Sequence, residues 1–130
     1  MIDVIINSYN EPKATLRAVN VFLNQYSGKD MRVIVVDPFP EVEIFLKKNI
    51  KDKRFYFFLD PGEGKSYSLN LIFQEFGSKN SDDIFILTDG DIFVSDNAIE
   101  EILKSFENEE IGCVTGMPVS TDSRKEKYGY

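Results

Sequence analysis

The chain has 130 residues, and its net charge of -7 (15 Lys and Arg against 22 Asp and Glu) argues against a nucleic-acid partner. It has no His, which excludes Ser-His and Cys-His catalysis and leaves oxygen ligands, and therefore Mg²⁺ or Mn²⁺, for any metal. Its single Cys cannot form an internal disulfide, which favours a cytoplasmic location, and no apolar run is long enough for a transmembrane segment.

Apolar segments of two periodicities alternate along the chain. Short continuous runs, typical of strands buried on both faces, lie at residues 4–6, 33–36, 55–59, 84–87 and, more weakly, 113–119. Between them apolar residues recur at helical spacing over residues 16–23, 42–46, 69–76 and 99–106. Asn10 is the expected N-cap of the first helix. This order predicts an α/β fold, a Rossmann-like, mostly parallel sheet with helices on both faces, in which residues 1–130 form one domain.

Polar clusters follow the first four predicted strands. They lie at residues 7–11, at Asp37, at residues 60–65 and at residues 89–91. In a parallel sheet the carboxyl ends of the strands meet at one edge, where ligands bind. We therefore expect these clusters to form one site.

Asp89 and Asp91 flank Gly90 directly after the fourth strand. Alternate positions of an extended chain face the same way, so two carboxylates at this spacing can hold a divalent cation. Such a cation would let this acidic chain bind a diphosphate. Asp-Gly is also common in simple turns, and the pattern alone leaves that interpretation open.

Gly64-Lys65-Ser66 matches the end of a P-loop motif. The motif needs a further Gly five residues before Gly64, where this chain has Leu59 inside the third strand, so a P-loop-like nucleotide site is a minor alternative. A Lys at a helix N-terminus opposes the helix dipole unless an anion lies between them, although Lys65 can also be simply exposed.

Three further residues allow both a functional and a structural interpretation. Asp37 can accept hydrogen bonds from a base or ribose, or can belong to a turn before Pro38. Tyr9 can stack on a base or close the core. Cys113 is expected to be a core thiol.

The order of five motifs resembles that of the GT-A nucleotide-diphospho-sugar transferases, especially glycosyltransferase family two. The resemblance runs from Ile5 to Val119 and covers the front, donor-binding part of that family's domain. The motifs are Ile5-Ile6-Asn7-Ser8-Tyr9-Asn10-Glu11, Val33-Ile34-Val35-Val36-Asp37, Gly64-Lys65-Ser66-Tyr67-Ser68-Leu69-Asn70, Ile86-Leu87-Thr88-Asp89-Gly90-Asp91 and Ile111-Gly112-Cys113-Val114-Thr115-Gly116.

The resemblance implies a donor site for a nucleoside-diphosphate sugar, most simply a UDP-sugar, with Mn²⁺ or Mg²⁺ as cofactor and transfer of the sugar to an acceptor hydroxyl. Asp89 and Asp91 would be the DxD motif, with Asp91 on the metal and Asp89 on the ribose and the metal shell. Ser8, Tyr9 and Glu11 would line the base pocket. Asp37 would accept a hydrogen bond from the base, and Lys65 would lie near the nucleotide.

The chain departs from the family pattern in two places. Pro38-Phe39-Pro40 replaces a polar run after Asp37. No residue matches the family's catalytic base, so the acceptor-binding half is expected to be absent and residues 120–130 to be a mobile tail. The strand that the family inserts next to the fourth strand is also missing, and the resulting sheet edge favours self-association. A non-catalytic nucleotide-sugar-binding or interaction domain is the alternative function.

Overall fold

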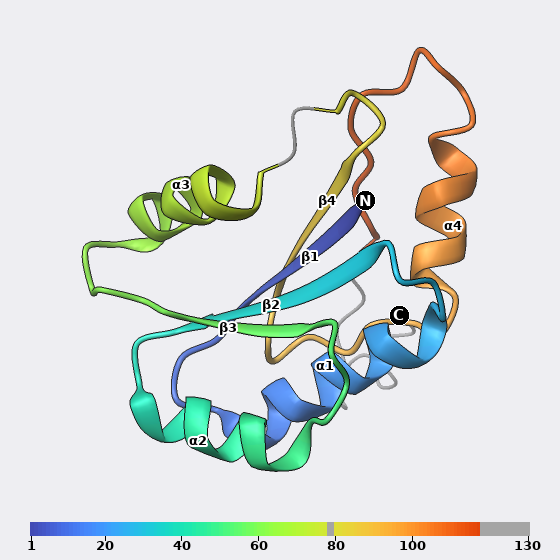
Figure 1. Cartoon of the computed structure of the whole chain (residues 1–130). Helices are drawn as coiled ribbons and strands as arrows, with labels where there is room; N and C mark the ends of the chain where they lie inside the picture. The colour runs from blue at the N-terminus through green and yellow to red at the C-terminus, as the bar shows by residue number, and fades with distance from the viewer. Residues whose placement is uncertain (78–79, 118–130) are drawn as a thin grey trace, which may run out of the picture. The chain divides into compact units, whose positions relative to one another are not determined.

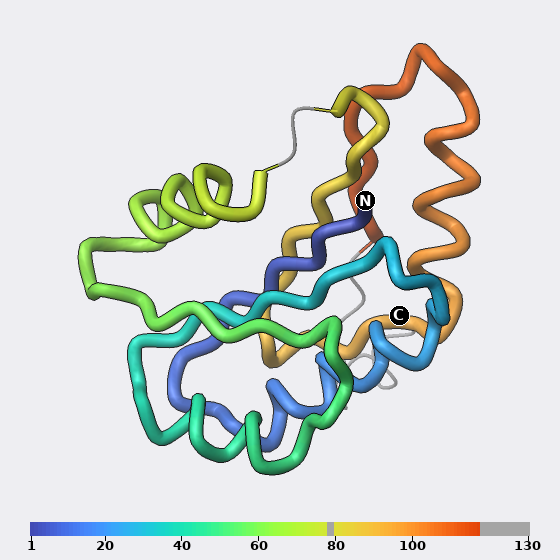
Figure 2. Tube along the Cα trace, viewed as in Figure 1, coloured from blue at the N-terminus to red at the C-terminus, as the bar shows by residue number. Residues whose placement is uncertain are grey.

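The computed structural model describes residues 1–77 and 80–117, and the chain divides into two compact units, Met1–Ile99 and Glu100–Tyr130. The described part of the first unit contains a four-stranded, all-parallel sheet in the order β3-β2-β1-β4 (Figures 1 and 2). Its strands are β1 (Ile2–Asn7), β2 (Met31–Asp37), β3 (Phe55–Leu59) and β4 (Ile84–Asp89). The expected α/β fold with a parallel sheet is therefore confirmed.

The register of the sheet divides its residues between two faces. Ile5 lies opposite Ile34 and Leu87, and Asn7 lies opposite Val36 and Asp89. Successive side chains of a strand point to opposite faces, so these residues share one face. The intervening residues of each strand, Asp37 among them, belong to the other face.

Helices cover both faces (Figure 1). On the first face, α3 (Lys65–Phe76) places Ile72 against Ile5, Ile34 and Val36. On the second face, α1 (Pro12–Gln25) and α2 (Pro40–Asn49) bury Phe22 and Leu46. Removing these side chains from water is the main term that stabilises the fold.

Helix α1 starts one residue later than the sequence predicted. Its N-cap is Glu11, and the prediction of Asn10 is wrong. Asn10 has φ 51° and donates its backbone N–H to Asp37 Oδ2 at 3.0 Å. Asn tolerates this left-handed conformation better than most residues, so it forms the turn that joins β1 to α1.

Arg54 closes the other end of α1. Its guanidinium donates to the carbonyl oxygens of Leu23 at 3.0 Å, Gly28 at 3.2 Å and Tyr26. It also pairs with Asp52 at 2.8 Å. The last carbonyls of a helix have no partner within the helix, and Arg54 supplies one.

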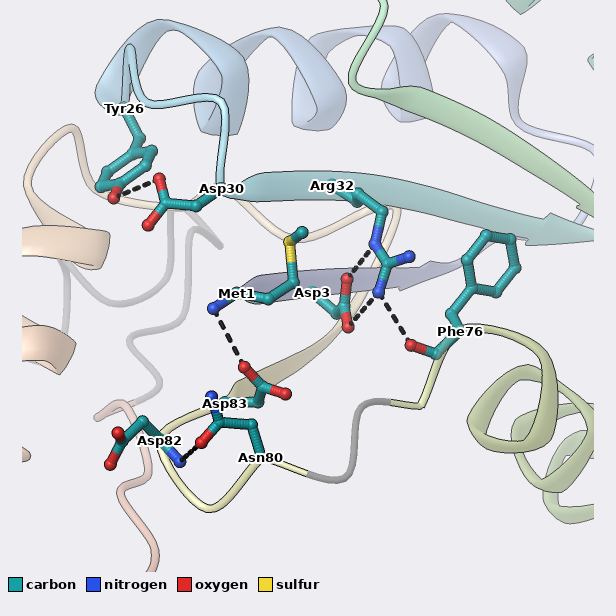
Figure 3. A network of polar contacts seen from close by, with 9 residues as sticks. All are labelled: Met1, Asp3, Tyr26, Asp30, Arg32, Phe76, Asn80, Asp82 and Asp83. Atoms are coloured by element: carbon teal, nitrogen blue, oxygen red, sulfur yellow. Dashed lines mark hydrogen bonds and ion pairs between the residues drawn. The ribbon is translucent and has the colours of Figure 1, made fainter.

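An ion-pair network joins the amino ends of β1, β2 and β4 (Figure 3). Arg32 donates to both carboxylate oxygens of the fully buried Asp3, at 2.7 and 2.9 Å, and to the carbonyl of Phe76 at 2.8 Å. The Met1 ammonium pairs with Asp83 at 3.0 Å. This network lies at the end of the sheet opposite to the predicted site.

The prediction of a fifth strand at residues 113–119 is wrong for its described part. Residues 113–117 have no regular secondary structure, and Cys113 is exposed rather than a core thiol. Only Cys113 and Val114 are apolar between Gly112 and Gly116, and glycines weaken a strand. Residues 118–119 and the expected tail at 120–130 lie outside the described residues. The last helix in the described part of the chain is α4 (Ala98–Ser105).

Candidate functional site

A pocket of about 390 Å³ opens at the carboxyl ends of the strands in the first unit. It lies where the strand order reverses between β1 and β4, which is where ligands bind in open α/β sheets. Three of the four predicted polar clusters, at residues 7–11, 60–65 and 89–91, contribute to its lining, whereas Asp37 does not. The pocket is lined by Asn7, Ser8, Tyr9, Glu11, Thr15, Val36, Asp60, Lys65, Asp89, Gly90 and Asp91.

The alternation of side chains along each strand decides which strand-end residues reach the pocket. Asn7, Val36 and Asp89 share the face of the sheet that α3 covers, and all three line the pocket. Asp37 comes one residue after Val36, so its side chain belongs to the other face. It is fully buried and is absent from the described pocket lining.

The Asp37 carboxylate holds the loop after β1. Oδ2 accepts hydrogen bonds from the Ser8 hydroxyl and from the Asn10 N–H, and Oδ1 accepts one from the Phe39 N–H at 2.7 Å. The Ser8 backbone N–H is bound to the Val36 carbonyl at 2.9 Å. Ser8 therefore lies in the pocket with its hydroxyl proton directed to Asp37.

Tyr9 and Glu11 form the outer wall of the pocket on the β1 side. The Tyr9 side chain is 71% exposed, and its ring meets Phe39 edge-on with 5.0 Å between ring centroids. This contact holds the ring at one side, and most of the side chain remains exposed. The Glu11 carbonyl binds the Thr15 N–H and hydroxyl, so its backbone builds the start of α1 while its side chain stays exposed.

Gly90 allows the end of β4 to approach α1 closely. Its N–H donates to the Asn7 carbonyl at 2.7 Å. A Cβ at this position would lie 2.9 Å from Thr15 Oγ1 and 3.3 Å from Ser8 Cβ, which is too close for unstrained contact. The glycine of the Asp89-Gly90-Asp91 motif thus sets the position of both carboxylates.

Lys65 crosses the pocket from the first residue of α3. Its Nζ lies 3.1 Å from Asp89 Oδ1, and the two side chains are 60% and 51% exposed. The preceding Gly64 has φ 103°, a conformation that favours glycine, and it turns the loop so that α3 begins at the pocket. Leu59, which stands where a P-loop motif needs its first glycine, lies inside β3 as predicted.

Asp60 belongs to the predicted polar cluster at residues 60–65, but the sequence argument gave it no role of its own. Its Oδ1 accepts from the Gly62 N–H at 2.8 Å and from the Ser68 hydroxyl at 2.6 Å, so it shapes the loop before α3. Its position directly after a strand, in phase with Val36 and Asp89, was a usable signal. Asn7, from the predicted cluster at residues 7–11, also lines the pocket, together with Thr15 and Val36, which were not predicted.

The sequence model of glycosyl transferase family 2 matches residues 3–130. The chain belongs to this family. The match confirms the resemblance that rested on five short motifs, and membership implies a nucleotide-sugar donor as ligand. No curated protein and no solved structure gives a significant match.

The described residues offer only a small set of ligands for a metal ion. Among residues 1–77 and 80–117, no three His, Cys, Asp or Glu side chains are grouped so that they could hold a metal ion. Asp89 and Asp91 offer two carboxylates at the rim. That fits Mg²⁺-type ions, which take one or two protein carboxylates and complete their shell with substrate phosphates and water.

The described residues include no helix that is long and apolar enough to cross a membrane.

Proposed function

We propose that this chain binds a nucleoside-diphosphate sugar, with UDP as the nucleotide, together with Mn²⁺ or Mg²⁺, for transfer of the sugar to an acceptor hydroxyl. The observation that carries the proposal is one pocket that combines Asp89, Asp91 and Lys65 with the polar loop after β1. The family match supports the same class of reaction.

Two groups of lining residues suit the two parts of such a donor. Asp89 and Asp91 would hold the cation beside the diphosphate, and Lys65 would add a positive charge at the start of α3. A cation held there would supply positive charge to offset the charge that develops on the leaving diphosphate. An anionic ligand needs this help, because the chain itself carries a net charge of -7.

The base end is built from Ser8, Tyr9 and Glu11, with Asp37 behind Ser8. Because the Ser8 hydroxyl donates to Asp37, its lone pairs are free to accept a hydrogen bond from a ring N–H of the base. Asp37 would thus act on the base through Ser8 rather than by direct contact. The exposed Tyr9 ring would stack on the base.

The transfer step requires a base that removes the proton of the acceptor hydroxyl as its oxygen displaces the nucleoside diphosphate. We assign this role to no residue among those that the structure describes. The proposal for the described residues is therefore donor binding.

Calorimetric titration with UDP in the presence of Mn²⁺ tests the proposal. We expect heat of binding for the unchanged chain, a large loss of affinity for Asp91→Asn, and unchanged affinity for Asp96→Asn, which removes an exposed carboxylate outside the described pocket lining. An absence of heat with the unchanged chain, or equal affinities for the two variants, would overturn it. ATP binding that survives Asp91→Asn but not Lys65→Met would instead support the P-loop alternative.

A further inference from the structure

Lys65 and Asp89, two residues of the pocket lining, form an ion pair with 3.1 Å between Nζ and Oδ1. The ammonium comes from the first residue of α3 and the carboxylate from the last residue of β4, so the pair joins two elements that are 24 residues apart in the chain. The contact engages Oδ1 of Asp89, and both residues line the pocket.

The position of Lys65 is unfavourable for a cation without such a partner. A positive charge in the first turn of a helix opposes the helix dipole, and the N–H groups of that turn attract anions. The carboxylate of Asp89 offsets this cost in the free protein. A bound diphosphate could offset it equally well, because it would bring anionic oxygens to the same helix start.

We propose that Lys65 makes cation binding at Asp89 and Asp91 depend on the nucleotide. In the free chain the ammonium occupies the carboxylate oxygen that a divalent cation needs and repels a second positive charge. When a diphosphate enters, Lys65 transfers its ion pair to the phosphate oxygens and releases Asp89. The role of the diphosphate rests on the proposed function, whereas the competition between Lys65 and the cation does not.

Two consequences follow from this exchange. A cation alone binds weakly, because it must displace the ammonium. Cation and nucleotide strengthen each other's binding by one common factor, since coupling between two ligands is reciprocal. Lys65 contributes part of this factor, so Lys65→Met should make it smaller.

Titration with Mn²⁺ alone, and then with UDP at saturating Mn²⁺, separates these effects. Lys65→Met should tighten binding of Mn²⁺ alone by about two- to fivefold, the range expected for an exposed ion pair, and should weaken binding of UDP. Lys53→Met, which removes an exposed positive charge from a turn at the opposite end of the sheet, should change neither affinity. A role of Lys65 in folding alone would not move the two affinities in opposite directions.

A double-mutant cycle tests the contact between Lys65 and Asp89. In an Asp89→Asn background, Lys65→Met should tighten Mn²⁺ binding less than in the unchanged chain, because the ion pair is already lost and only the repulsion between ammonium and cation remains. Unchanged or weaker Mn²⁺ binding in Lys65→Met overturns the proposal, and so does tightening that is undiminished in the Asp89→Asn background. If the unchanged chain binds no UDP, the proposed function fails, while the titrations with Mn²⁺ alone still decide whether Lys65 competes.

Discussion

Ser8 donates its hydroxyl proton to the buried Asp37 carboxylate, and this contact decides what the hydroxyl can offer to a ligand. It can accept from a base that carries a ring N–H, as uracil does, and it suits cytosine less well because the equivalent ring nitrogen is an acceptor. Ser8→Ala should therefore lower the preference for UDP over CDP by about two- to tenfold, the value of one hydrogen bond. The ratio of the two dissociation constants measures this effect. Ser27→Ala, an exposed serine outside the described pocket lining, serves as the control, and an unchanged ratio in Ser8→Ala would contradict the assignment.

Gly90 occupies a position in the site that has no room for a side chain. Gly90→Ala would place a Cβ 2.9 Å from Thr15 Oγ1 and push the end of β4 away from α1. We expect a loss of about 1–3 kcal/mol in the free energy of unfolding, typical of overpacking, and weaker binding of UDP with Mn²⁺.

Denaturant unfolding checks the Gly90 prediction. Thr15→Ala removes the atom that the new Cβ would meet, so it should cost less in the Gly90→Ala background than in the unchanged chain. Strictly additive costs would show that this contact is not the cause.

At the scale of elements, Arg54 joins the end of α1 to the turn before β3. Arg54→Met leaves the carbonyls of Leu23 and Tyr26 without this donor and should reduce the free energy of unfolding by about 1.5–3 kcal/mol at pH 7. Lys53→Met, next to it in the same turn, should have little effect.

The pH dependence of the unfolding free energy distinguishes the ion pair of Arg54 with Asp52 from its contacts with carbonyl groups. Hydrogen bonds from Arg54 lower the pKa of Asp52, so their ion pair stabilises the fold above the ordinary aspartate pKa of about 3.9 and is lost as the pH falls through the lower folded-state value. The cost of Arg54→Met should therefore shrink in acid without vanishing, because the carbonyl contacts remain. A cost that is independent of pH would show that Asp52 contributes nothing.

At the scale of the whole first unit, the pocket and the buried ion pair lie at opposite ends of one sheet. The pocket lies at the carboxyl ends of the strands, and the Asp3–Arg32 pair lies at their amino ends (Figure 3). Arg32→Met would leave the fully buried Asp3 carboxylate without its cation, and we expect a loss of about 3–5 kcal/mol in unfolding free energy.

Affinity for UDP with Mn²⁺, measured well below the unfolding transition, should stay unchanged in Arg32→Met. Adding Asp3→Asn should recover part of the lost stability, because no buried charge then lacks a partner. A fall in affinity at temperatures where the variant is fully folded would show that the two ends are coupled.

The sequence predicted the order of the elements and the edge of the sheet that carries the pocket, because apolar periodicity and strand ends are local properties. It did not reveal the partners of Asp37, which come from residues 8 and 10 of a distant loop and from Phe39. The error at Cys113 has a similar cause, because an apolar residue is buried only where another element covers it. The Lys65–Asp89 contact depends on how α3 and β4 are placed in space, and no spacing in the chain encodes it.

The in-register pairing of Asn7 with both Val36 and Asp89 has a consequence for how the chain can change length. Many side chains in β4 can be exchanged without moving the pocket, but one residue inserted between Ile84 and Asp89 would turn Asp89 to the opposite face of the sheet. An insertion of two residues would restore the face but move the carboxylate along the strand, away from Lys65. Within β4, the number of residues is therefore more tightly constrained than their identity, whereas the turns at the amino ends of the strands can accept insertions without disturbing the pocket.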